Sequence, residues 1–300
     1  MTEAEDAVVD GLPGERAKAA GETSSDERVT MIERLSSVVG VDFSAFEAPY
    51  RSFITTAQMD VQNHEFYWDL SDLHDQLSRE LVVGKIRAVD AWANGETAFK
   101  LVVKPWESVL DKLYRLNIEE NPEDGPPQLL SIDDRAEKKR VPSVRAWVTP
   151  DRVHEFADDL IRTKFVVPFV DGVVDVSSRI AGAAKALGLK SFPRYHAKDS
   201  GYHARHIYVV IPVVDGSGAD VHIALEVKVL TKLQDTLSEL THLLYELKRT
   251  GQAPSVKKRK LAWQFGDADF EASYVGHSAH YIEASLVRLK ERLAAFEDKD

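Results

Sequence analysis

Apolar residues recur at three- and four-residue steps early in the chain, which is the spacing of one face of an α-helix. Two such stripes lie in residues 27–83, namely Met31, Leu35, Val38 and Val39, and then Phe66, Leu70, Leu73, Leu77 and Leu81. Residues 1–26 are rich in Ala, Glu, Asp, Gly and Ser and show no such period. Because that composition buries little apolar surface, we expect a disordered acidic tail followed by a helical segment.

The apolar period changes to two after residue 83, as is typical of β-strands. Asn94-Gly95 separates two such stretches and favours a hairpin turn, because both residues accept positive φ. Further strands are expected at 141–148, 165–176, 206–214 and 221–230, with helices at 105–116, from 149 to about 161, and at 177–187. The pattern predicts an α+β fold over residues 84–300, with a mixed β-sheet flanked by helices.

Two long helices with apolar seams are expected to close the chain. The first seam comprises Leu233, Leu237, Leu240, Leu244 and Leu247, and the second comprises Ile282, Leu286, Leu289, Leu293 and Phe296. The second helix also carries His277, His280 and Glu283 at three-residue steps, a spacing that can ligate a metal. Two histidines without further ligands are a weak metal signal, so packing or hydrogen bonding is favoured for them.

Composition narrows the classes of protein that fit. The chain has 300 residues, 44% of them hydrophobic, a net charge of -11 and no cysteine, so a sizeable core is possible and disulfides and thiolate metal sites are excluded. The start is acidic rather than basic and apolar, and no apolar run is long enough to span a bilayer. We therefore expect a cytoplasmic protein without a membrane segment. Two basic runs, 138–140 and 257–260, are either solvated loops or phosphate-binding patches.

The strand expected at 221–230 carries one carboxylate among β-branched residues. Period two places Glu226 with His222 and Lys228 on a face away from the apolar core. Two interpretations stay open for this residue. Glu226 is either a general base in a cleft or the partner of Lys228 on a solvated face.

Two other groups of residues are suited to binding nucleotides. Lys104, Ser108 and Lys112 follow one another at four-residue steps near a helix start, which suits a triphosphate but also describes an ordinary basic face. Tyr202 follows a Ser-Gly turn, and its ring is either a stacking surface for a purine or a half-buried strand residue. His206 and Lys198 beside it bind phosphate oxygens, hold Glu226, or have structural roles only.

Several of these residues match motifs of the synthetase domain of the RelA/SpoT family of nucleotide pyrophosphokinases. The family loop P-K-x-x-G-Y-R-S-x-H resembles residues 197–206, which keep Lys198, Gly201, Tyr202 and His206. The family strand E-x-Q-x-R-T resembles residues 226–231, which keep the Glu and the Thr but have Lys228 and Leu230 in place of Gln and Arg. The helix pattern D-x-W-x-x-x-E-H resembles Asp235, Leu237, Thr241 and His242.

The upstream motifs are similar with more departures. R-x-K-x-P-x-S-x-x-x-K resembles the stretch from Val102 to Lys112, in which Val102 replaces the first Arg. D-x-x-G-x-R is placed on Arg140, Ser143 and Arg145, where its Asp is missing. The resemblance covers about residues 99–250.

The resemblance implies pyrophosphoryl transfer from ATP to the ribose 3′-hydroxyl of a guanosine nucleotide, with Mg²⁺ as the expected cofactor. It implies that Glu226 is the base and that Tyr202, His206 and Lys198 bind the acceptor. The implied phosphate clamp consists of Lys104, Ser108, Lys112 and Arg145. The metal ligands stay unknown, with Asp133, Asp134 and Glu226 as candidates.

Two alternatives stay open beside this function. The acceptor can be the 3′ end of tRNA, as in toxic small members of this family, or the chain can be a catalytically degenerate nucleotide-binding protein. A homo-oligomer is possible in each case.

Overall fold

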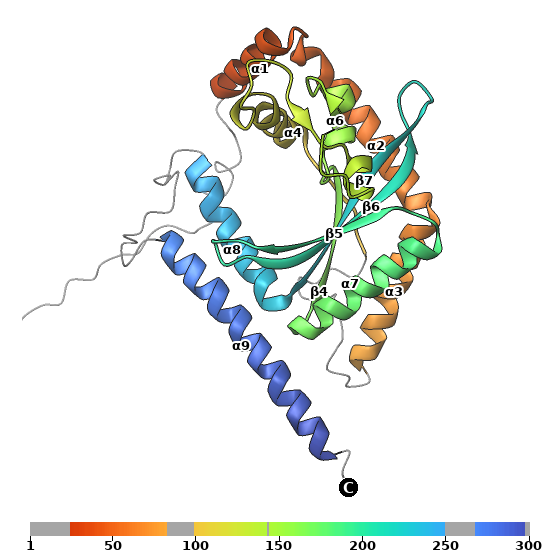
Figure 1. Cartoon of the computed structure of the whole chain (residues 1–300), viewed down its shortest axis with the longest axis vertical. Helices are drawn as coiled ribbons and strands as arrows, with labels where there is room; N and C mark the ends of the chain where they lie inside the picture. The colour runs from red at the N-terminus through yellow and green to blue at the C-terminus, as the bar shows by residue number, and fades with distance from the viewer. Residues whose placement is uncertain (1–24, 83–98, 143, 250–267, 298–300) are drawn as a thin grey trace, which may run out of the picture.

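The computed structural model describes residues 25–82, 99–142, 144–249 and 268–297. Its centre is a five-stranded sheet with the order β1-β4-β7-β6-β5, in which β4 and β7 are parallel and the other neighbours are antiparallel. The strands are β1 (Val102–Val103), β4 (Ile161–Val167), β5 (Ser191–Ala197), β6 (His203–Val214) and β7 (Asp220–Thr231). This mixed sheet flanked by helices confirms the predicted α+β class (Figure 1).

Helices surround the sheet on both sides (Figure 1). They are α1 (Ser25–Val39), α2 (Glu47–Asn63), α3 (Glu65–Val82), α4 (Trp106–Tyr114), α5 (Ile132–Ala136), α6 (Val153–Phe156), α7 (Val170–Ala186), α8 (Lys232–Arg249) and α9 (Ala268–Glu297). Short helical turns lie at Phe43–Phe46, Arg115–Glu119 and Pro150–Arg152, and a small second sheet pairs β2 (Gln128–Leu129) with β3 (Val144–Arg145).

The main core lies on one face of the sheet. There the apolar stripes of α2, α3 and α7 meet the odd-numbered residues of β6 and β7, exemplified by Ile54, Leu70, Ile180, Leu225 and Val227. Because side chains alternate along a strand, the even-numbered residues of the same strands face the other way. The prediction that Glu226 lies on the face opposite the apolar core is therefore confirmed.

The structure differs from the sequence prediction around the strand β4. A strand was predicted over 165–176, whereas β4 ends at Val167 and the helix α7 begins at Val170. Gly172 explains the tight return of the chain, because a Cβ there would lie 3.0 Å from the Cβ of Val167. The β-branched run after it serves as the buried face of a helix, with Val173 and Val176 in the core.

Three neighbouring segments also differ from their predictions. The strand expected over 141–148 pairs only at Val144–Arg145, and the helix expected from 149 ends at Phe156. The strand β5 was not predicted, because Pro193 interrupts its pattern. Proline is tolerated there because β5 is an edge strand.

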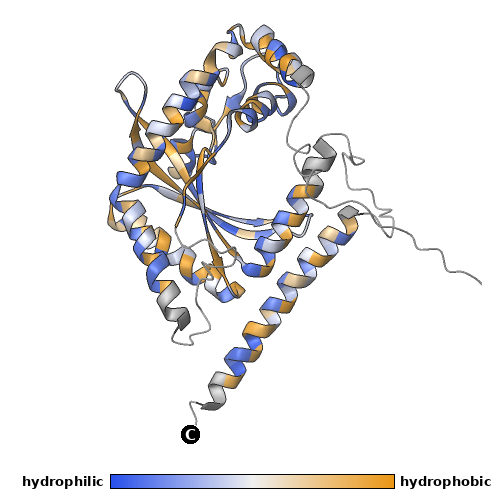
Figure 2. Cartoon of the chain, turned by 180° about the vertical axis from the view of Figure 1, so that it is seen from behind, coloured by the Kyte–Doolittle hydropathy of each residue, from blue (hydrophilic) through white to orange (hydrophobic). Residues whose placement is uncertain are grey.

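The predicted apolar seam of the last helix is not the face by which α9 packs. Ile282, Leu286, Leu289 and Leu293 are all exposed, and Figure 2 shows apolar residues recurring along this helix. The buried positions are small or polar for the most part and comprise Ser273, Gly276, Ala279, Glu283 and Val287. The helix therefore makes a close backbone approach rather than burying its largest side chains.

Some predictions lie outside the described residues, namely most of the N-terminal tail, the Asn94-Gly95 hairpin and the basic run 257–260. Within the described ranges, no helix has the length and hydropathy needed to cross a bilayer.

Candidate functional site

The polar face of the sheet gathers Glu226, His206 and Tyr208 from neighbouring strands. Tyr208 on β6 stands opposite Glu226 on β7, and His206 stands opposite Lys228. Glu226 and His206 are both buried, at 5% and 6% exposure. Tyr202, half-buried, lies in the turn just before β6.

A chain of hydrogen bonds joins these side chains. His206 Nδ1 lies 2.7 Å from Glu226 Oε1, and His206 Nε2 lies 2.9 Å from the Tyr202 hydroxyl. An imidazole protonated on Nδ1 donates to Glu226 and accepts from Tyr202. The Tyr208 hydroxyl also donates to Glu226 Oε1, at 3.4 Å. The sequence prediction thus brings Tyr202, His206 and Glu226 together correctly.

The second oxygen of Glu226 is held less completely. Glu226 Oε2 is buried and has no hydrogen-bond partner, although Lys228 Nζ forms an ion pair with it at 3.5 Å. Burial alone would raise the pKa of Glu226, but the hydrogen bond from His206 and the charge of Lys228 outweigh it, so this pKa lies below its ordinary value. Glu226 is therefore ionised at neutral pH, and a general base with a raised pKa is not what this environment provides.

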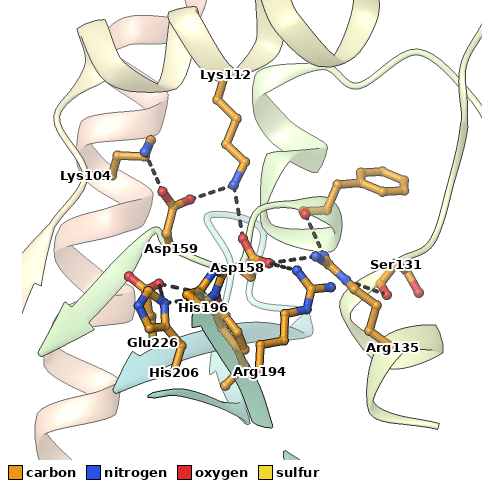
Figure 3. Close-up of polar contacts among 12 residues, drawn as sticks. Lys104, Lys112, Ser131, Arg135, Asp158, Asp159, Arg194, His196, His206 and Glu226 are labelled. Carbon is orange, nitrogen blue, oxygen red and sulfur yellow. Dashed lines mark hydrogen bonds and ion pairs between the residues drawn. The ribbon is translucent and has the colours of Figure 1, made fainter. Parts of the chain in front are cut away.

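A cluster of charged residues lies beside this chain, built around Asp158 and Asp159 just before β4 (Figure 3). Lys104 Nζ lies 2.6 Å from Asp159 Oδ2, and Lys112 Nζ lies 2.7 Å from Asp159 Oδ1 and 3.2 Å from Asp158 Oδ1. The pKa of Asp159 is held well below its ordinary value, because the two lysines outweigh the effect of burial. Burial lowers the pKa of Lys104, whereas that of Lys112 is raised by the two aspartates despite its burial.

Two arginines extend the cluster toward β5. Arg135 Nη1 lies 2.8 Å from Asp158 Oδ2, and Arg194 Nη1 lies 3.5 Å from the same oxygen. The Arg194 guanidinium also lies over the ring of Tyr208, 5.6 Å from its centroid, which links the cluster to the Glu226 chain. Four cations thus surround two carboxylates, and an excess of positive charge of this kind is suited to binding phosphates.

The remaining predicted site residues occupy different places. Ser108 lies on α4, one turn before Lys112, and is half-buried. Lys198 is exposed, and its ammonium lies 5.5 Å from the centroid of the Tyr202 ring. Arg145 lies in the small second sheet, exposed, where it contacts Glu123 and the carbonyl oxygen of Pro126. The contacts of Arg145 thus lie in the small sheet and not with Lys104, and its part in the phosphate clamp stays a prediction.

Asp158 and Asp159 were not predicted as site residues from the sequence, and they lie just before β4. On β4, Arg162 stands beside Glu226 in register, and Lys164 Nζ contacts Asp235 at 2.8 and 3.0 Å. The signal in the sequence was an Asp-Asp pair directly before a β-branched run.

Few of the described carboxylates are placed to hold a Mg²⁺ ion. The described chain holds no group of three or more potential metal ligands. Of the candidates from sequence, Asp133 contacts His222 at 3.1 Å through Oδ2 and leaves Oδ1 buried without a hydrogen-bond partner, while Asp134 forms a capping box with Ser131. Asp159 belongs to the charge cluster and Glu226 lies beside it in Figure 3, and a Mg²⁺ arriving with phosphates needs one or two carboxylates from the protein, although it would have to share Asp159 with Lys104 and Lys112.

Within the basic run at 138–140, Lys139 forms ion pairs with neighbouring carboxylates. Lys139 Nζ lies 2.8 Å from Asp134 and 3.0 Å from Glu137, and Glu137 also contacts Lys190 at 2.7 Å. Ion pairs of this kind favour a solvated surface over a phosphate-binding patch.

Comparison with known proteins gives similarity in structure alone. No family model and no curated protein match the chain. Small alarmone synthetase 1 from Bacillus subtilis, solved with its product pppGpp, has a TM-score of 0.46 and 15% identity over 84% of this chain and 97% of its own. A GTP pyrophosphokinase family protein from Streptococcus pneumoniae has a TM-score of 0.47 and 16% identity, covering 83% of this chain and 93% of its own. Small alarmone synthetase 2 from Bacillus subtilis has a TM-score of 0.41 and 15% identity, covering 76% and 96%.

Proposed function

We propose that the chain transfers pyrophosphate from ATP to the ribose 3′-hydroxyl of a guanosine nucleotide. The observation that carries this proposal is the position of Glu226, whose ionised carboxylate has one buried oxygen without a hydrogen-bond partner beside an excess of cations. A buried oxygen of this kind is expected to receive a proton donor or a cation from a ligand. A ribose hydroxyl and a Mg²⁺ ion both meet this requirement.

The charge cluster is assigned to the donor triphosphate. Phosphoryl transfer depends mainly on positioning and on neutralising charge, so cations have the central part. Lys104, Lys112 and Arg194 have carboxylate partners, which phosphate oxygens of ATP can replace or share. Asp159 and Glu226 would hold a Mg²⁺ ion, which would offset the charge that develops in transfer.

Glu226 is assigned to the acceptor hydroxyl. The O3′ oxygen forms a bond to the β-phosphorus, the bond from that phosphorus to the bridging α–β oxygen breaks, and AMP leaves. The hydroxyl proton passes to Glu226 Oε2, while His206 holds Oε1 and fixes the direction of the carboxylate. A low pKa makes Glu226 a modest base, so its larger contribution is orienting the hydroxyl.

Tyr202 is assigned to the guanine base, and the Lys198 side chain lies over the ring face on which the base would stack. One face of the ring lies below the Lys198 ammonium, and the ring also packs against the apolar group of Val166, Ala204 and Leu230. A purine can stack on Tyr202 when the exposed Lys198 side chain moves aside to meet a phosphate.

The experiment is incubation of the purified chain with ATP labelled at the γ-phosphate and GDP, GTP or deacylated tRNA. Label on GDP or GTP supports the proposal. Label on tRNA would replace it with RNA modification. Absence of label on all acceptors would favour the degenerate nucleotide-binding protein, a function motivated by the carboxylate partners that Lys104 and Lys112 already have.

A further inference from the structure

The turn that carries Tyr202 touches the last helix, α9, backbone to backbone. Gly201, with a φ of 79°, lies against Gly276 of α9. A Cβ on Gly276 would lie 2.5 Å from the carbonyl oxygen of Gly201 and 2.8 Å from its Cα, distances that real Cβ atoms do not adopt. No side chain larger than hydrogen fits between the turn and the helix at this point.

Hydrogen bonds fasten both ends of the same turn to α8 and α9. Ser273 Oγ on α9 donates to the carbonyl oxygen of Asp199, at 2.5 Å. Gln234 on α8 accepts from the backbone N–H of His203 at 3.1 Å and donates to the carbonyl oxygen of Gly276 at 3.0 Å. His203 Nε2 also lies 3.0 Å from His277 Nδ1 on α9.

The buried face of α9 has the small residues that a close backbone contact needs rather than the large apolar residues of a hydrophobic core. Its buried residues near the turn are Ser273, Gly276 and Ala279, while its large apolar side chains are exposed. Figure 1 shows α9 outside the sheet, and Lys290 near its C-terminal end pairs with Asp171 of α7. A helix that mainly stabilised the core would bury its leucines instead.

We propose that α9 positions the acceptor-binding turn, with Gly276 as the positioning residue, and this inference rests on the proposed function. Tyr202 follows Gly201 directly, and its hydroxyl bonds His206, which in turn bonds Glu226. Displacing the turn therefore moves the acceptor platform and loosens the Glu226 chain. Lys104, which follows β1, and Lys112 on α4 pair with Asp159 in the loop before β4 and are not part of this connection.

The test compares Gly276→Ala with Gly182→Ala, a matched change in the helix α7 where an added Cβ meets nothing within 4 Å. We expect Gly276→Ala to raise the KM for the guanosine acceptor by on the order of 10- to 100-fold, because displacements of about 1 Å have effects of that size. The KM for ATP should change less than twofold. Gly182→Ala should leave both constants as in the wild type.

Amide hydrogen exchange of residues 198–203 gives a readout that does not depend on activity. We expect faster exchange there in Gly276→Ala than in Gly182→Ala. If the wild type transfers no pyrophosphate, the proposed function fails, whereas the exchange result still decides whether α9 holds the turn. Unchanged exchange in a folded Gly276→Ala variant, or equal increases in both KM values, would overturn the inference.

A second variant covers the case in which Gly276→Ala does not fold. Ser273→Ala removes the bond to Asp199 without adding atoms, so folding should be retained. We expect it to shift acceptor KM and turn exchange in the same direction by a smaller factor. An acceptor KM and a turn exchange rate both equal to the wild type in this variant would also overturn the inference.

Discussion

Replacing His206 by Ala removes the donor that holds the buried carboxylate of Glu226. The remaining partners of that carboxylate are the Tyr208 hydroxyl at 3.4 Å and Lys228 at 3.5 Å, both longer than the 2.7 Å bond that is lost. A hydrogen bond to a charged group contributes about 1.5–3 kcal/mol. Because Lys228 and Tyr208 retain part of the stabilisation, we expect a loss of about 2–3 kcal/mol in the free energy of unfolding.

His206→Asn is the matched variant for this loss. Its side-chain amide can place a nitrogen near the position of Nδ1 and donate to Glu226, although it cannot reach Tyr202. We expect it to lose about 1 kcal/mol less than His206→Ala, roughly the value of one retained hydrogen bond. Urea denaturation at pH 7.5, followed by circular dichroism and fluorescence, measures both variants.

The loss of stability in His206→Ala should depend on pH, because it acts through the ionised carboxylate of Glu226. The pKa of Glu226 is lower in the folded chain than in the unfolded chain, so its contribution is present above about 4.5 and is lost as pH falls through the folded pKa. The difference between wild type and His206→Ala should therefore stay constant from pH 7.5 to about 4.5 and narrow as pH falls below that value. Equal losses in the Ala and Asn variants, with no pH dependence, would mean that His206 acts through packing alone.

Three further predictions concern the acceptor, the donor and the last helix. Tyr202→Ala should weaken acceptor binding by about 1–3 kcal/mol in titration calorimetry, and an unchanged affinity would return Tyr202 to a packing role. Lys112→Ala should raise the KM for ATP about tenfold or more with little change for the acceptor, and the reverse pattern would remove Lys112 from the donor site. Burial raises the pKa of Glu283 to about 7, so its contribution to stability is lost as pH rises through 7. The melting temperature of Glu283→Gln should therefore rise relative to that of the wild type as pH is raised from 5 to 8. A difference in melting temperature that does not change with pH would contradict this.

The strands β6 and β7 were predictable because their two faces have different chemistry. Alternating Val, Ile and Leu against His, Glu and Lys specified both the strand and the side on which Glu226 lies. The meeting of Tyr202, His206 and Glu226 followed from that register, since His206 and Glu226 are near-neighbours on adjacent strands. The alternation of side chains along a strand and the pairing of two consecutive strands depend on nearby residues, so both can be predicted from the sequence.

The charge cluster was less predictable because tertiary contacts create it. Asp158 and Asp159 stand at the end of a helical pattern in sequence and acquire their importance from Lys104 and Lys112, more than forty positions earlier along the chain. Arg194 was not predicted because it lies on β5, an edge strand whose sequence pattern is interrupted by Pro193. The partnership of Gly201 with Gly276 has no signal in either segment alone and is visible only once the helix is placed.

The central claim is that this site moves an intact pyrophosphate group from ATP to a guanosine nucleotide with the help of Glu226. The most direct measurement is a quantitative separation of nucleotides after reaction, for the wild type and for Glu226→Gln. The account predicts one AMP for each guanosine nucleotide that gains two phosphates, and turnover lower by a factor of about 10² or more in Glu226→Gln with ATP binding retained. Formation of ADP in place of AMP, or equal turnover by the two proteins, would contradict it.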